Sequence, residues 1–184
     1  MSSSLSILVA FASARGSTGE IAGFIANRLR LKGFDVDLCS VDQAPNPRHY
    51  DVVVVGSAIH DRAWLPDAER FLRRHRVVLQ GRDVWLFSVG LSPALHGPVG
   101  RRLKRAVPKN IASLLELISV REYAVFAGVF SRADTTRVSR IVYRLIGGGG
   151  FGDLRDWQAI ARWTDGIGAA VSRRGLTDAT HEAP

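Results

Sequence analysis

Residues 5–20 read LSILVAFASARGSTGE and join a short apolar run to the beginning of a helical pattern. An apolar run followed at once by glycine and small hydroxyl residues predicts a buried strand that turns directly into a helix. Backbone N–H groups converge at such a helix N-terminus and favour an anion. The turn lacks the lysine of a Walker A sequence and the GxGxxG spacing of a dinucleotide site. It therefore predicts a site for a monophosphate ester, formed by Ser13, Ala14, Arg15, Gly16, Ser17 and Thr18.

Short apolar runs recur along the chain and are rich in β-branched and aromatic residues. They alternate with segments of helical spacing, such as Ile21, Ile25 and Leu29. This alternation is typical of a parallel sheet covered by helices on both faces. One run alternates polar and apolar residues, as an edge strand with one exposed face does. We predict a doubly wound α/β fold with a five-stranded parallel sheet in the order 2-1-3-4-5, with strands near Leu5–Ala12, Asp35–Val41, Val52–Gly56, Val84–Val89 and Tyr123–Val129.

The chain has 184 residues, 46% of them apolar, which suits one domain with its own core. We predict a domain over residues 1–172 and a polar C-terminal tail over residues 173–184. Residues 5–12 are expected to form a strand and not a secretion signal, and no apolar run reaches the roughly 18 residues of a membrane span. Cys39 is the single cysteine, and the histidines lack the spacing of a metal site. We expect a cytoplasmic protein without a metal.

Two further loops, after the third and fourth predicted strands, are expected to contribute to the same site. The carboxyl ends of parallel strands meet at one edge of a sheet, where ligands bind. His60 and His96 follow these strands and are the candidates for proton chemistry. A purely structural role for the first turn stays open, because Ser17 or Thr18 could cap the helix. The loop residues assigned to the site are Ser57, Ala58, Ile59, His60, Ser88, Val89, Gly90 and Leu91.

The net charge of +8 indicates an anionic partner or surface. Two segments, Arg101–Lys109 and Arg137–Arg144, place arginine and lysine opposite aliphatic residues at helical spacing. Such segments suit peripheral, reversible binding to an anionic membrane. An ordinary solvated helix face is the structural alternative for both. Nucleic acid is not expected as a partner, because the chain has no recognisable DNA- or RNA-binding module.

Three segments together resemble a known family: FASARGSTGEIA at residues 11–22, VVVVGSAIH at residues 52–60 and GGGGFGDLRDWQAIARW at residues 147–163. The chain resembles the flavodoxin-like, menaquinone-dependent protoporphyrinogen oxidases and, more broadly, the flavodoxin-domain proteins, from about Leu5 to Val171. The first segment is shared by most flavodoxins. The late GG-x-x-D-x-R-x-W pattern points to the narrower group, although its spacing here contains one extra residue. The loops also lack the tyrosine that many flavodoxins stack on the flavin.

The resemblance implies FMN as the cofactor, with Ser13, Arg15, Gly16, Ser17 and Thr18 around its phosphate. The loops that start at Ser57 and Val89 would then flank the isoalloxazine ring. It also implies an FMN-dependent oxidoreductase that passes electrons from an organic donor, protoporphyrinogen IX, to a quinone at the inner face of the membrane. The alternatives are a non-catalytic electron-transfer module that docks on a redox partner protein, and a relative that binds a deazaflavin.

Overall fold

The computed structural model describes residues 5–61, 63–91, 93, 109–130 and 152–181. Its main sheet has five parallel strands in the order β2-β1-β3-β5-β6, and the short β4 pairs antiparallel with the end of β3. The predicted strand order is therefore confirmed, with β4 as an addition. A separate two-stranded ribbon joins β7 to β8. The strands are β1 (Ser6–Ala12), β2 (Asp35–Ser40), β3 (Val52–His60), β4 (Ala63–Trp64), β5 (Asp83–Gly90), β6 (Val120–Ala127), β7 (Val129–Phe130) and β8 (Gly152–Asp153).

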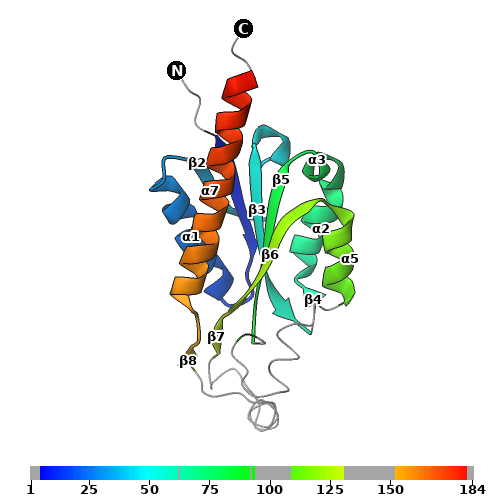
Figure 1. The fold of residues 1–184 in the computed structure, drawn as a ribbon. Coiled ribbons are helices and arrows are strands. Elements are labelled where there is room, and N and C mark those ends of the chain that lie inside the picture. Colours follow the sequence, from blue (N-terminus) through cyan, green and yellow to red (C-terminus); the bar gives the residue numbers. More distant parts are fainter. Residues whose placement is uncertain (1–4, 62, 92, 94–108, 131–151, 182–184) are drawn as a thin grey trace, which may run out of the picture.

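Helices cover both faces of the sheet, as the sequence predicts (Figure 1). On one face lie α1 (Ser17–Arg30) and the long α7 (Trp157–His181). On the other lie α2 (Pro66–Arg74), α3 (Arg76–Gln80) and α5 (Lys109–Leu117), while the single turn η1 (Pro47–His49) precedes β3. Because α7 continues to His181, the predicted polar tail is helical as far as that residue. The division of the chain at residue 172 stays a prediction.

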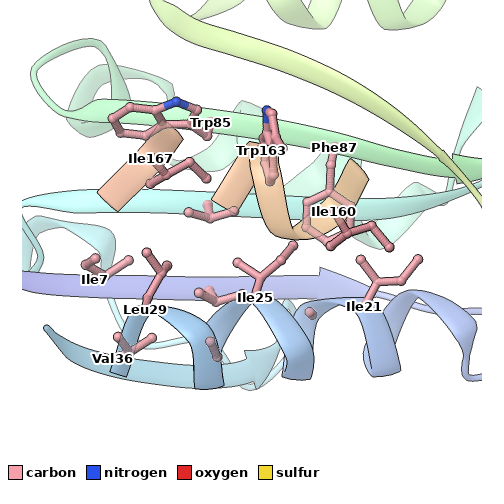
Figure 2. Packing of buried hydrophobic residues seen from close by; sticks show 14 of the residues in the cluster. Ile7, Ile21, Ile25, Leu29, Val36, Trp85, Phe87, Ile160, Trp163 and Ile167 are labelled. Atoms are coloured by element: carbon pink, nitrogen blue, oxygen red, sulfur yellow. The ribbon is translucent and has the colours of Figure 1, made fainter. Parts of the chain in front are cut away.

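The core consists of two apolar layers, one on each side of the sheet. Side chains alternate along every strand, so Ile7 and Val9 face α1 and α7 while Leu8 and Ala10 face α2, α3 and α5. Figure 2 shows the first layer, in which residues of α1 and α7 close over the central strands. Burial on both faces explains why the strands read as continuous apolar runs. The edge strands differ, since β2 exposes Asp35, Asp37 and Leu38 and β6 exposes Arg121 and Glu122.

The strand register brings the ends of the central strands to one edge. Ala12 of β1 pairs with Ser57 of β3, which pairs in turn with Ser88 of β5. Gly56 is required just before this edge, because a Cβ there would lie 2.0 Å from Phe87 Cζ. The register therefore assembles the three predicted loops at the carboxyl edge of the sheet.

Candidate functional site

The turn between β1 and α1, residues 13–18, is folded by contacts within itself. Ser13 Oγ accepts the backbone N–H of Gly16 at 2.9 Å, which closes a short side-chain turn. Gly16 has a φ of +91°, in the left-handed region that favours glycine, and its carbonyl accepts the N–H of Glu20 at 3.0 Å. The small residues of this turn are thus required by its backbone conformation.

The first turn of α1 has no side-chain cap. Gly16 occupies the N-cap position and no side chain accepts a hydrogen bond there, so the interpretation of Ser17 or Thr18 as a cap is wrong. The N–H groups of the first helical turn have no partner within the helix. They remain donors for a group outside it.

Thr18 carries a buried hydroxyl group that finds no hydrogen-bond partner in the described part of the chain. Its side chain is 0% exposed, and Oγ1 is one of two buried side-chain polar atoms that form no hydrogen bond among the described residues. The other is Nε1 of Trp163, which lies in the core beside the rings of Phe87 and Phe126. An unpaired buried hydroxyl is costly, so native structures retain one mainly where another group completes it. Thr18 therefore has a hydroxyl hydrogen that no other described residue accepts, at the start of α1.

Gly128, which the sequence analysis did not assign to the site, brings three elements together. A Cβ at this position would lie 2.9 Å from Val89 Cγ1 and 3.2 Å from Ser17 Oγ. The absence of a side chain therefore lets the end of β6 pack against both the β1–α1 turn and the end of β5. The only signal for it in the sequence is a glycine within the predicted strand Tyr123–Val129.

The residues predicted as loops after the third and fourth strands are mostly strand residues. β3 extends to His60 and β5 to Gly90, beyond the apolar run predicted for each. The extension of β3 has a partner, since Ile59 pairs with Trp64 and His60 with Ala63. The loops are consequently shorter than predicted, and their residues sit in a rigid sheet edge.

Ser57 and Ser88 point their hydroxyl groups into the protein. Ser57 Oγ accepts the N–H of Leu65 at 3.0 Å and donates to the carbonyl of Ala58. Ser88 Oγ accepts Nε1–H of Trp64 at 2.6 Å and lies 2.7 Å from the hydroxyl of Tyr123. Both serines are fully buried, so their hydroxyls hold the strand ends together. Trp64 is also buried in this network.

The other residues predicted for the two loops, His60 aside, form an apolar border beside the β1–α1 turn. They are Ala58, Ile59, Val89, Gly90 and Leu91. Ala58 and Val89 are register partners, and a Cβ at Gly90 would lie 3.3 Å from the side chain of Ile59. Leu91 is exposed at the end of this border.

His60 ends β3 with an exposed side chain, and its Nδ1 lies 3.2 Å from the carboxylate of Asp61. The other candidate, His96, lies outside the described residues, as do the basic segment at 137–144 and all of the segment at 101–109 except Lys109, which begins α5.

The late motif packs against α1 close to the turn. Arg155 donates to both carboxylate oxygens of Asp153, at 2.8 and 2.6 Å, and pairs with Glu20 in the first turn of α1. Its guanidinium lies over the ring of Trp157, 4.6 Å from the ring centroid. Trp157 in turn contacts Phe24, with ring centroids 5.1 Å apart. Hydrogen bonding to Arg155 holds the pKa of Asp153 below its usual range. Glu20 and Arg155 are 135 residues apart in the chain, so sequence spacing does not reveal their contact.

Two surface hollows lie elsewhere and are lined by none of the predicted site residues. One, of about 370 Å³, runs between the end of β2 and α2, and the other, of about 430 Å³, lies at the amino edge beside β5 and β6. Among the described residues, no group of three His, Cys, Asp or Glu side chains is placed to hold a metal. Across the same segments, no helix has the length and apolar character needed to cross a bilayer.

Comparison with known proteins agrees with this geometry. The family model of the flavodoxin domain matches residues 8–147. Protoporphyrinogen IX dehydrogenase [quinone] of Escherichia coli strain K12 is 25% identical over 171 residues, which span 85% of this chain and 91% of that protein.

Two solved structures are similar in fold. A flavodoxin from Streptococcus pneumoniae TIGR4 superposes with a TM-score of 0.55 at 14% identity, covering 92% of this chain and 99% of that one. The flavodiiron protein from Giardia intestinalis has a TM-score of 0.57 at 13% identity, covering 97% of this chain and 38% of that one.

Proposed function

The chain belongs to the flavodoxin domain family, and on this premise we propose that it is an FMN-dependent oxidoreductase. Its donor is an organic molecule, protoporphyrinogen IX, and its acceptor is a quinone at the membrane surface. The donor and the acceptor are inferred from the similarity to protoporphyrinogen IX dehydrogenase [quinone] of Escherichia coli and from the late motif. The observation that carries the FMN assignment is the buried, unpaired hydroxyl of Thr18 beside the uncapped start of α1.

The residues of the β1–α1 turn fit a phosphate group. Thr18 Oγ1 has a hydrogen to donate, the first N–H groups of α1 lack partners within the helix, and the left-handed Gly16 leaves no side chain over them. In our proposal, Ser13, Ala14, Arg15, Gly16, Ser17 and Thr18 hold the phosphate.

The sheet edge beside the turn suits the ring. In our proposal the isoalloxazine ring of FMN lies beside Ala58, Ile59, His60, Val89, Gly90 and Leu91. Ser57 and Ser88 support the strand ends from inside the protein. Apart from the imidazole of His60, the residues beside the ring offer aliphatic and backbone atoms, and none is a tyrosine or tryptophan.

When bound, FMN supplies the electron transfer that side chains alone do not perform. The residues of this chain bind it, orient it and exclude water along the apolar edge formed by Ile59 and Val89. His60 and His96 are the candidates for moving a proton at the donor; in His60, Nδ1 faces Asp61 and Nε2 is the nitrogen left for that role.

The experiment that tests the cofactor is the visible absorption spectrum of the purified protein before and after addition of FMN. The ligand released on denaturation is then identified by mass spectrometry, which also distinguishes FMN from a deazaflavin. Absence of binding at every accessible FMN concentration contradicts the assignment.

The substrates are tested with FMN-loaded protein. We expect oxidation of protoporphyrinogen IX that depends on a menaquinone analogue, and no electron transfer to any such analogue contradicts the quinone role. A vesicle assay tests the membrane role: the charge of the segments at 101–109 and 137–144 predicts binding to anionic but not to neutral vesicles, weakened by salt.

A second candidate is a non-catalytic electron-transfer module, which the net charge of +8 favours because it suits an acidic redox partner. Such a module exchanges electrons with a partner protein in a salt-dependent manner and does not turn over small substrates. Steady-state turnover of protoporphyrinogen IX distinguishes the two candidates.

A further inference from the structure

Glu20 places a negative charge where the proposed function needs an anion to bind. It is the acidic residue of the first turn of α1, and its Oε1 lies 4.0 Å from the position of a Cβ on Gly16, the N-cap residue. The side chain is 62% exposed and lies four residues after the N-cap, so rotation about its side-chain bonds would turn the carboxylate toward the first N–H groups of the helix. Glu20 is therefore an internal competitor for the donors that would hold a phosphate.

Arg155 faces this carboxylate from a rigid position. Its side chain is 9% exposed, its Nε and Nη2 both donate to Asp153, and its guanidinium is stacked on Trp157. One nitrogen, Nη1, reaches Glu20 across the boundary between the C-terminal segment and α1. Because three contacts fix the arginine, the flexible partner in the pair is Glu20.

The charges of Glu20, Asp153 and Arg155 indicate the electrostatic effect of the arginine. Glu20, Asp153 and Arg155 together carry one net negative charge, and without the arginine they would carry two. An added negative charge in the first turn of a helix next to a bound phosphate opposes binding.

We propose that Arg155 is a positioning residue for the phosphate site: it holds the Glu20 carboxylate away from the first-turn donors of α1 and neutralises it. The inference rests on the proposed binding of FMN. It also assigns a role to the arginine of the late motif, which is far from the turn in sequence but adjacent to it in the fold.

The experiment is a double-mutant cycle on the full chain, with the FMN dissociation constant as the readout. We expect Arg155→Gln to weaken FMN binding roughly tenfold, since an uncompensated carboxylate then faces the phosphate. Glu20→Gln alone changes the constant by no more than about threefold, and the double variant Glu20→Gln/Arg155→Gln restores binding to within about threefold of wild type. Riboflavin, which lacks the phosphate, binds the Arg155→Gln protein as it binds wild type.

Asp165→Asn is the matched control. Asp165 accepts from Arg28 at 2.7 Å and from Lys32 at 2.9 Å, so it also ties α1 to α7, but at the other end of α1. We expect this variant to leave the FMN dissociation constant unchanged.

Two results separate the inference from the function on which it rests. If wild type binds no FMN, both are overturned. If it binds FMN and the double variant is as weak as Arg155→Gln, the inference alone is overturned, because a merely structural arginine is not rescued at Glu20. Should Arg155→Gln not fold, Arg155→Met, which also removes the charge, replaces it in the same cycle, and an absence of coupling with Glu20→Gln again overturns the inference.

Discussion

Replacement of Thr18 by valine should stabilise the protein without cofactor and at the same time weaken FMN binding. Valine keeps the shape of threonine and replaces its hydroxyl with a methyl group. The hydroxyl is fully buried and has no partner among the described residues, so the apo protein bears its desolvation cost. In the proposed complex, the same hydroxyl donates to the phosphate.

The magnitudes follow from the two environments of the hydroxyl. An unpaired buried polar group costs about 1–3 kcal/mol, and valine and threonine have similar helix propensities. We therefore expect the free energy of unfolding of the apo protein to rise by about 1 kcal/mol, or roughly 2–4 °C in Tm for a chain of this size. Loss of a hydrogen bond to a charged group costs about 1.5–3 kcal/mol, which predicts a dissociation constant for FMN about tenfold to a hundredfold higher.

The assay combines denaturant unfolding of the apo protein with fluorescence titration of FMN. Thr164→Val is the matched control: Thr164 is equally buried, but its hydroxyl donates to the carbonyl of Ile160 at 2.8 Å. That variant should lose about 0.5–1.5 kcal/mol of stability and keep its affinity for FMN. If the Thr18→Val apo protein is less stable than wild type, the claim that the Thr18 hydroxyl is unpaired is refuted. If its affinity for FMN is unchanged, Thr18 does not belong to the phosphate site.

Three further predictions concern the scaffold. Gly56→Ala places a Cβ 2.0 Å from Phe87 Cζ, so chemical denaturation should show a loss of about 1–3 kcal/mol, and Phe87→Leu in the same chain should cost less than the sum of the two changes. Asp83 is buried, which opposes its ionisation, but hydrogen bonds from two arginines outweigh this and lower its pKa. Its contribution to stability is complete above the unfolded pKa of about 3.9 and is lost as the pH falls toward the lower folded pKa, so Asp83→Asn should flatten the acid limb of the stability curve. Trp64→Phe removes the 2.6 Å hydrogen bond to Ser88 and should cost about 1–3 kcal/mol, and no loss of Tm would argue against that network.

Local patterns carry most of the information about the sheet. The apolar runs at residues 5–12, 52–56 and 84–89 are long enough to be strands buried on both faces, and the structure confirms their order. The turn at residues 13–18 is equally visible, because glycine and small hydroxyl residues next to a helical pattern restrict the backbone locally. Strand ends are less visible, since β3 continues past residue 56 through pairing with β1 and β5 at Ser57 and Ala58 and with β4 at Ile59 and His60.

The hydrogen-bond partners of a side chain depend on tertiary contacts, and the local sequence pattern does not specify them. Ser57 and Ser88 occupy the predicted edge, yet packing against Trp64 and Leu65 turns their hydroxyls inward. Strand alternation places both serines on the face covered by α2, α3 and α5, but it does not specify which partners their hydroxyls meet there. The serines were assigned from position alone, and tertiary contacts decide what their hydroxyls bind.

The sequence by itself therefore determined the fold class, the strand order and the position of the β1–α1 turn, because these depend on periodicity and on backbone restrictions between near neighbours. Only the tertiary structure decided that the Thr18 hydroxyl is buried without a partner among the described residues and that Arg155 meets Glu20 across 135 residues. The physical reason is that burial and ion pairing depend on which surfaces the folded chain brings together, and the length of chain between two residues does not specify that.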